Sequence, residues 1–189
     1  MDLKSLFSSI DDSAFLENLA NVRRIPCGIA PFDVAMGGGL PQGRSMEMFG
    51  PESSGKSTIA LHFARSVQKL GGYVVAIDGE YAYDDSRIAA LKLDRDKTIV
   101  VHPDTLEDAY KVLTTMCTKI VESKETIPVV YLIDSITSFP TQGEKDSAGG
   151  MASQARVNSA NLRMAVPLVS QSGGLLIGIN QTRDNLGIT

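Results

Sequence analysis

Short hydrophobic runs alternate with longer amphipathic stretches along most of the chain after Gly43. The hydrophobic runs predict strands at residues 45–49, 73–78, 98–102, 129–134 and 175–180. The amphipathic stretches predict helices at residues 57–70, 104–123 and 152–170. Strands that alternate with helices are typical of βαβ units, and near-continuous apolar strands indicate a parallel sheet with both faces covered. We therefore expect an α/β fold, with a mostly parallel twisted sheet and helices on both faces.

The first residues of the chain follow a different pattern. From Met1 to Asn21 the apolar positions are spaced three and four residues apart, which predicts one or two short amphipathic helices. Arg23–Pro26 is predicted to be a linker, and Gly37–Gly43 has the composition of turns. We expect an N-terminal helical segment over residues 1–28 and a core over residues 29–189. Within the core, the Gly- and charge-rich stretch 139–150 predicts a mobile loop.

Composition and charge limit the class of protein. The 189 residues are 43% apolar and 21% charged, with no Trp, as in one globular domain. The 18 Lys and Arg against 22 Asp and Glu give a net charge of −4, so a nucleic-acid partner needs a local basic surface. Cys27 and Cys117 lack metal-ligand spacing, and the start of the chain differs from a signal peptide. No apolar run reaches the roughly 18 residues that span a bilayer, so we expect a cytoplasmic protein.

The strongest chemical signal is the segment Gly50–Ser57, whose sequence fits G-x-x-x-x-G-K-[ST]. It lies between a predicted strand and a predicted helix, as a phosphate-binding P-loop requires. Its glycines let backbone N–H groups point at phosphates, Lys56 adds a charge for the β and γ phosphates, and the Ser57 hydroxyl can bind Mg²⁺. A Gly-rich turn with an incidental lysine is the alternative. The nucleotide-binding candidates are Gly50, Pro51, Glu52, Ser53, Ser54, Gly55, Lys56, Ser57 and Thr58.

Polar residues at the ends of three other strands are candidates for the remaining chemistry. Asp134 ends the most apolar strand and matches a Walker B aspartate that holds Mg²⁺, although an Asp at this place can also cap a turn. Asp78 and Glu80 follow another buried strand, and Glu80 is the candidate base that orients or deprotonates water. Spacing alone does not decide between these two acids. Gln181 can hydrogen-bond a γ-phosphate or be an ordinary loop residue.

Five sequence blocks resemble those of RecA-type recombinases, in the same order and with similar spacing. They are Gly39–Arg44, Gly50–Ser57, Ile77–Glu80, Leu132–Ser135 and Ile179–Arg183. The G-P-E-S-S-G-K form is far more specific than a generic P-loop, and the resemblance runs from Ile29 to Thr189. It implies a RecA-like P-loop ATPase core that uses ATP and Mg²⁺. It also implies a strand-exchange protein that polymerises on single-stranded DNA, with ATP held between neighbouring subunits.

The resemblance also implies roles for individual residues. Glu80 matches the family's catalytic glutamate, which decides between the two acids that spacing leaves open. Asp134 matches the metal-side aspartate, and Gln181 matches the glutamine that couples the γ-phosphate to the second DNA-binding loop. Asp84 matches an acidic residue near the adenine. Arg87 stands where bacterial members carry an aromatic residue that stacks on the base, and a guanidinium can stack there instead.

The DNA-binding positions implied by the resemblance lie in two loops and the helix between them. Residues 141–151 resemble the first loop, and Arg156 and Arg163 match arginines that contact phosphates. The start of the second loop, where an apolar side chain inserts between groups of bases, is matched by Arg183, Leu186 and Gly187. A few arginines and Gly-rich backbone can hold phosphates without a basic pI. The alternative for the helical pair of arginines is a solvated helix face.

Two parts of the chain depart from the family pattern. The N-terminal segment is expected to act like the family's polymerisation segment, although it shares no residue-level match with it. The chain stops at Thr189, within the second DNA-binding loop, whereas the family's core continues. We therefore expect a fragment, an ordered part, or one piece of a split protein whose remainder completes the sheet. Met46, Met48 and Phe49 would then lie on an uncovered apolar strand edge, which invites aggregation.

The expected function is that of a DNA-dependent ATPase and recombinase in a bacterial or phage-infected cell. Identical subunits would form a helical filament on single-stranded DNA, pair it with double-stranded DNA, and work with loader or mediator proteins. Lys56 and Mg²⁺ would neutralise developing charge while Glu80 positions water and Gln181 reports the γ-phosphate. The alternatives are an accessory paralogue that binds nucleotide without turnover and a hexameric helicase-type motor. A small-molecule kinase has the least support, because the sequence shows no lid-like arginine cluster.

Overall fold

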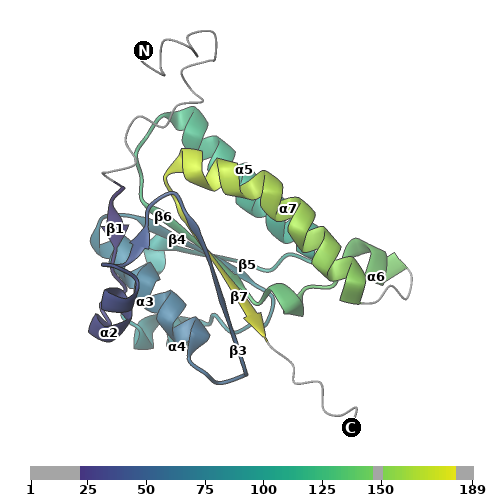
Figure 1. The fold of residues 1–189 in the computed structure, drawn as a ribbon, viewed down its shortest axis with the longest axis horizontal. Helices are drawn as coiled ribbons and strands as arrows, with labels where there is room; N and C mark the ends of the chain where they lie inside the picture. Colours follow the sequence, from purple (N-terminus) through teal and green to yellow (C-terminus); the bar gives the residue numbers. More distant parts are fainter. Residues whose placement is uncertain (1–21, 147–150, 182–189) are drawn as a thin grey trace, which may run out of the picture.

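The fold is built on a five-stranded parallel sheet. It is seen in a computed structural model that describes residues 22–146 and 151–181, except the side chains of 151–153. The strands are β3 (Ser45–Gly50), β4 (Tyr73–Asp78), β5 (Thr98–Val101), β6 (Val129–Asp134) and β7 (Leu175–Gln181). Their order is β3-β7-β6-β4-β5, and every neighbouring pair is parallel (Figure 1). The expected α/β class and parallel sheet are confirmed.

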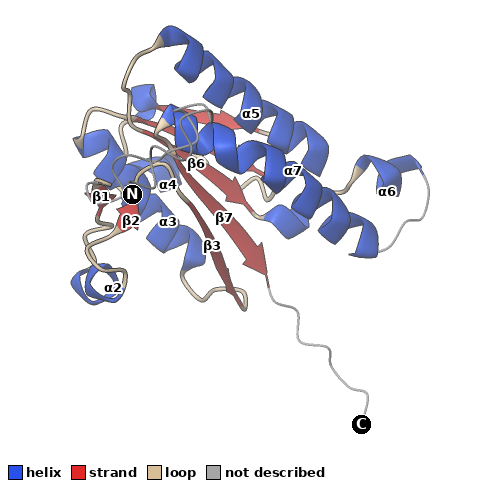
Figure 2. Ribbon diagram, turned by 45° about the horizontal axis from the view of Figure 1, so that its top comes forward, coloured by secondary structure: helices blue, strands red, loops and turns tan. Residues whose placement is uncertain are grey.

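Helices cover both faces of the sheet, as expected. Helices α2 (Ala30–Ala35), α3 (Lys56–Lys69) and α4 (Asp85–Ala90) lie on one side. Helices α5 (Leu106–Ser123) and α7 (Met151–Ser172) lie side by side on the other (Figures 1 and 2). Because successive side chains of a strand point to opposite faces, β4 sends Val74 and Ala76 toward α3 and Val75 and Ile77 toward α5. The sheet therefore separates two apolar layers.

The register of the strands brings their carboxyl ends to one edge of the sheet. Asp78 lies beside Asp134 across the β4–β6 pair, and Gly50 lies beside Gln181 across the β3–β7 pair. Residues far apart in the chain are thus placed side by side where open α/β sheets bind ligands. The carboxyl ends of the strands therefore hold most of the candidate site residues that the sequence indicates.

The segment predicted as a linker is part of the folded unit. Arg24–Ile25 forms strand β1, which pairs antiparallel with β2 (Leu40–Pro41), and Ile25 is only 1% exposed. The turn works because Gly39 has φ +117°, and a Cβ there would lie 2.3 Å from the Ile25 carbonyl oxygen. The linker prediction is therefore wrong for these residues. The helical segment predicted before them falls on residues 1–21, which lie outside the described residues.

The stretch predicted as a loop after Phe139 contains a short helix. Helix α6 (Gln142–Asp146) follows the 3-10 helix η4 (Ile136–Ser138), and a second 3-10 helix, η3 (Arg95–Lys97), precedes β5. Thr141 and Glu144 start α6 with a capping box, since the Thr141 N–H donates to Glu144 at 2.7 Å and the Glu144 N–H donates to the Thr141 hydroxyl at 3.2 Å. The loop prediction is wrong for these residues.

Among the described residues strand β3 pairs only with β7, so it lies at one edge of the sheet. Phe49 is 71% exposed there, as the sequence predicts. Met48 differs from the prediction, because its side chain turns inward and packs in the layer beneath α3. In the part of the chain that the structure describes, no helix has the length and hydrophobicity needed to cross a membrane.

Candidate nucleotide site

A pocket of about 490 Å³ opens at the carboxyl edge of the sheet, between the start of α3 and the ends of β4, β6 and β7. Most of the predicted site residues line it. The lining residues are Glu52, Ser53, Ser54, Gly55, Lys56, Ser57, Thr58, Glu80, Arg87, Asp134, Ile179 and Gln181. The fold therefore brings together four segments that are far apart in the sequence.

The loop before α3 has the backbone geometry of an anion site. Gly50, Ser53 and Gly55 have φ values of +153°, +58° and +87°, which curl the chain tightly between β3 and α3. Gly55 is the N-cap of α3, no side chain caps this end, and the first turn holds no acidic residue. The free N–H groups and the positive end of the helix dipole therefore face the pocket. Such a terminus binds anionic groups, phosphate among them.

The Lys56 ammonium group lies across the same loop. Its Nζ donates to the carbonyl oxygens of Gly50 at 2.9 Å and Pro51 at 2.6 Å, and it lies 3.5 Å from the Ser54 hydroxyl. These bonds fix the charge at the mouth of the curled backbone. Gly50 and Pro51 thus shape the site and orient its lysine from outside the pocket lining.

Asp134 is the most buried acidic group of the pocket, with 2% of its surface exposed. Burial raises the pKa of its carboxyl group, while Ser57 and the Tyr83 hydroxyl interact with the carboxylate and act in the opposite direction. Tyr83 donates to Asp134 Oδ2 at 2.9 Å, and burial raises the pKa of Tyr83 well above its ordinary value. Tyr83 thus stays a hydrogen-bond donor across the physiological pH range.

The oxygen atoms of Ser57 and Asp134 fit a magnesium ion. Mg²⁺ prefers one or two protein oxygens together with water and substrate phosphates, rather than a cage made only of protein ligands. Both residues line the pocket beside the phosphate-binding loop. Among the described residues no cluster of three or more His, Cys, Asp or Glu side chains could hold a metal alone. The donor set therefore suits a metal that arrives with a nucleotide.

Glu80 and Gln181 meet at the pocket wall, from the ends of β4 and β7. The Gln181 amide donates to Glu80 Oε1 at 2.7 Å, and the Ser138 hydroxyl donates to the same oxygen at 3.0 Å. Asp78 has a different role, because its buried carboxylate accepts the N–H groups of Glu80 and Tyr83, each at 3.0 Å. Asp78 thus shapes the loop that presents Glu80 to the pocket.

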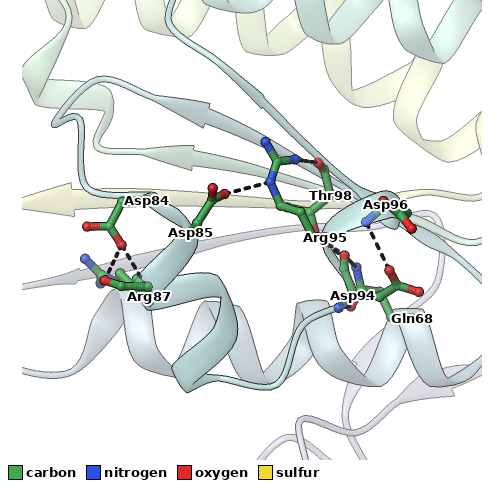
Figure 3. Close-up of polar contacts among 9 residues, drawn as sticks. Gln68, Asp84, Asp85, Arg87, Asp94, Arg95, Asp96 and Thr98 are labelled. Carbon is green, nitrogen blue, oxygen red and sulfur yellow. Dashed lines mark hydrogen bonds and ion pairs between the residues drawn. The ribbon is translucent and has the colours of Figure 1, made fainter.

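The two residues predicted near the adenine lie at the start of α4. Asp84 is the N-cap of α4 and accepts the Arg87 N–H at 2.7 Å, as Figure 3 shows, and its hydrogen bonds with Ser86 and Arg87 lower the pKa of its carboxyl group. It does not line the pocket. Arg87 does, and its guanidinium lies 5.5 Å from the centre of the Tyr83 ring. Only Arg87 is therefore placed to reach a ligand in the pocket directly.

The predicted DNA-binding residues lie away from the pocket or beyond the described chain. Arg156 and Arg163 are exposed on α7, and Arg163 Nε donates to the Ser159 carbonyl oxygen at 3.3 Å. Arg183, Leu186 and Gly187 lie outside the described residues, as does part of the 141–151 loop. The structure therefore places two of the five candidates, both on one helix.

Sequence reasoning misses three residues of this site. Tyr83 is indistinguishable from a core aromatic by sequence pattern, and Ser138 lies in a stretch with no recognisable motif. Ile179 lines the pocket from within an apolar strand, where the pattern indicates only burial. Only the fold reveals these contacts, because each partner lies on a different element.

Comparison with known proteins agrees with this fold and this site. A family model described as the RecA N-terminal domain matches residues 13–189. Protein RecA of Rippkaea orientalis is 39% identical over 171 residues, which are 89% of this chain and 47% of that protein. Protein RecA of Symbiobacterium thermophilum is 40% identical over 172 residues, with the same two shares.

A plant relative extends the comparison. The chloroplastic DNA repair protein recA homolog 1 of Arabidopsis thaliana is 38% identical over 172 residues, covering 89% of this chain and 38% of that protein. The chain thus spans about half the length of the bacterial relatives and less of the plant protein. Since the family model covers nearly the whole sequence, the chain belongs to the RecA family, and the matched region is its N-terminal domain.

Proposed function

We propose that this chain is the nucleotide-binding part of a RecA-type recombinase, which binds ATP with Mg²⁺ and hydrolyses it in response to DNA. The observation that carries the proposal is the single pocket that joins Lys56, Ser57, Asp134, Glu80 and Gln181. A cation, two metal-binding oxygens, a candidate base and a hydrogen-bond donor are the groups that phosphoryl transfer to water requires. The DNA-repair role named for its plant relative agrees with this function.

ATP would bind with its phosphates against the start of α3. The uncapped N–H groups of the first turn and the Lys56 ammonium group supply positive charge there, and Arg87, which also lines the pocket, would contact the base. Ser57 and Asp134 would hold Mg²⁺, which neutralises charge on the phosphate oxygens when it is bound. Thr58 and the side chains of residues 52–54 complete the wall of the phosphate site.

Hydrolysis would begin with a water molecule held by Glu80. The carboxylate lies at the pocket wall, and hydrogen bonds from Ser138 and Gln181 fix one of its oxygens, so the other oxygen is available to orient water. Gln181 is the last residue of β7 and leads into the segment predicted to bind DNA. A change in that segment would therefore reach Glu80 through a single hydrogen bond.

DNA would bind along the exposed face of α7 and the loops beside it. Arg156 and Arg163 are the described residues that would contact phosphates, and Arg183, Leu186 and Gly187 are proposed for the second loop. Single-stranded DNA would support a helical filament of identical subunits, with ATP at the boundary between neighbours. Double-stranded DNA and mediator proteins would be the further partners of that filament.

ATP hydrolysis, measured with and without single-stranded DNA at two salt concentrations, tests the proposal. We expect DNA to stimulate hydrolysis, and high salt to weaken the stimulation because phosphate contacts release counterions. Lys56→Ala should remove both nucleotide binding and turnover. Nucleotide binding without any DNA response would instead favour the accessory protein that does not hydrolyse ATP.

A pair of arginine substitutions tests the proposed DNA surface separately. The double variant Arg156→Ala/Arg163→Ala should bind single-stranded DNA more weakly and with a shallower salt dependence, by about one unit of slope per lost phosphate contact. Lys69→Ala is the matched control, since it removes an exposed cation from α3 on the other face of the sheet. Equal losses in the control and the double variant would show that α7 is not the DNA surface.

A further inference from the structure

Tyr83 makes a buried contact with the Asp134 carboxylate that the proposed reaction does not yet use. The Tyr83 side chain is 6% exposed and Asp134 is 2% exposed, and the hydroxyl group lies 2.9 Å from Oδ2. A hydrogen bond to a charged group in such a buried, low-dielectric environment is stronger than one at the surface. It holds the carboxylate in one orientation.

Two further contacts hold Tyr83 in place, one to its backbone and one to its ring. Its backbone N–H donates to the buried Asp78 carboxylate at 3.0 Å, and the Arg87 guanidinium lies over its ring, 5.5 Å from the ring centre. Arg87 also reaches the Ala82 carbonyl oxygen at 3.4 Å. The hydroxyl group is therefore presented to Asp134 by a side chain with little freedom to turn.

We propose that Tyr83 is a positioning residue for the metal, holding one oxygen of Asp134 so that the other faces Ser57 and the phosphate site. The proposal rests on the proposed nucleotide-binding function. Ligating carboxylates depend on such outer hydrogen bonds, and losing one typically costs about 10–100-fold in metal affinity. The ring of the same tyrosine lies beneath Arg87, so one side chain connects the wall that faces the base with the metal-binding oxygens.

The metal's contribution to nucleotide affinity tests the proposal without measuring turnover. The dissociation constant of a fluorescent ATP analogue is measured once with excess Mg²⁺ and once with EDTA, and the ratio of the two constants gives the metal enhancement. Tyr83→Phe should lower this enhancement about tenfold. It should leave the affinity in EDTA unchanged, because the phosphate-binding loop is intact. Loss of affinity under both conditions would mean a general structural role and would overturn the proposal.

Tyr81→Phe is the matched control. Tyr81 is 77% exposed and its ring stacks on His102, so the variant removes the same group two positions away without touching Asp134. Its metal enhancement should equal that of the unchanged chain. A folded Tyr83→Phe with the same enhancement as this control would overturn the proposal.

Two further variants keep the test decisive. Tyr83→Leu removes the hydroxyl with a smaller apolar side chain, and it should show the same loss if Tyr83→Phe does not fold. In an Asp134→Asn background, Tyr83→Phe should cause no additional loss of metal enhancement, because the carboxylate that it positions is gone. An unchanged chain that fails to bind the analogue at all would refute the proposed function itself, which is a different outcome from a failure at Tyr83.

Discussion

Glu80 and Asp78 are close in sequence but have different roles at this site. It lies two residues after Asp78, yet Asp78 is buried and binds backbone N–H groups, whereas Glu80 is exposed to the pocket. The strand ends between them, so the two carboxylates meet different surroundings. The buried acid stabilises the loop and the exposed acid remains available for chemistry.

Glu80→Gln should separate nucleotide binding from hydrolysis. The amide keeps an oxygen that accepts from Ser138 and Gln181, so the pocket should keep its shape and bind ATP normally. Turnover should fall by about 10²–10⁴-fold, because an amide cannot accept a proton from water. Binding and hydrolysis measured on one preparation check this, and normal hydrolysis would show that Glu80 is not the base.

Asp134→Asn should stabilise the fold in the absence of metal and nucleotide. Burial raises the pKa of Asp134, so the folded state holds a proton on this carboxyl more tightly than the unfolded chain does. Stability is therefore favoured at low pH and is lost as the pH rises through the raised pKa. At neutral pH we therefore expect the variant to have a higher free energy of unfolding than the unchanged chain.

Urea unfolding at a series of pH values measures that difference. The difference in unfolding free energy between the variant and the unchanged chain should shrink toward zero as the pH falls below about 4. In that range Asp134 of the unchanged chain is protonated in both the folded and the unfolded state. The variant should also lose the metal enhancement of nucleotide binding. An advantage that grows on acidification would contradict the expected sign.

At the scale of elements, the joint between α3 and β4 is closely packed. Leu70, Gly71 and Gly72 separate the two elements, and the Gly72 N–H donates to the Val67 carbonyl oxygen at 3.0 Å. A Cβ on Gly72 would lie 2.1 Å from the Pro128 carbonyl oxygen, whereas a Cβ on Gly71 would meet nothing within 4 Å. The joint therefore fixes how α3 presents the phosphate-binding loop.

Gly72→Ala should destabilise the chain by about 3 kcal/mol, because the new methyl group collides with backbone that cannot move alone. Gly71→Ala is the control, since it has open space but a φ of +86°, and it should cost only about 1 kcal/mol. Chemical denaturation of both variants gives the comparison. A smaller loss of unfolding free energy for Gly72→Ala than for Gly71→Ala would mean that the backbone at Pro128 can shift to accommodate the new methyl group.

The long elements could be predicted from sequence because one signal dominates each of them. Strands β4 and β6 have the predicted bounds, since unbroken apolar runs stop there at a charged residue. Helices α2, α4 and α6 are too short for a hydrophobic period, and only local capping marks two of them, at Asp84 and Thr141. In such short segments a turn and a helix differ by very few hydrogen bonds, so the sequence pattern does not distinguish them.

The candidate site could be predicted wherever a motif names the residue. Residues 52–57 of the P-loop line the pocket together with Asp134, Glu80 and Gln181, whereas Gly50 and Pro51 lie outside its lining. The Tyr83–Asp134 contact joins residues 51 positions apart, and it depends on the β4–β6 register and the path of the loop after Asp78. No local pattern carries that information.

For the whole molecule, the sheet has two different edges. Within the part of the chain that the structure describes, β5 ends the sheet on one side and β3 ends it on the other, with Phe49 71% exposed beside the phosphate-binding loop. An exposed edge that carries an apolar side chain is a site for pairing with another chain. The β3 edge is therefore where we expect the isolated chain to self-associate.

Phe49→Lys should reduce that self-association and leave the free energy of unfolding nearly unchanged, because the side chain is already in solvent. Ile99→Lys changes the β5 edge, where Ile99 is 42% exposed, and should have a smaller effect. Sedimentation velocity over a range of concentrations compares the two variants with the unchanged chain. Equal self-association of both variants and the unchanged chain would show that neither sheet edge is the site of association.

In the proposed function, the Lys56 bonds to the Gly50 and Pro51 carbonyl oxygens would make nucleotide binding an exchange reaction. An incoming phosphate competes with two acceptors that the loop itself supplies, so only the surplus appears as affinity. A triphosphate would offer several charged oxygens to replace these two acceptors, whereas a ligand with one phosphate would offer fewer. In the proposed function, the loop's own carbonyl oxygens would therefore compete with the ligand for Lys56, and we expect this competition to favour ligands with more phosphate groups.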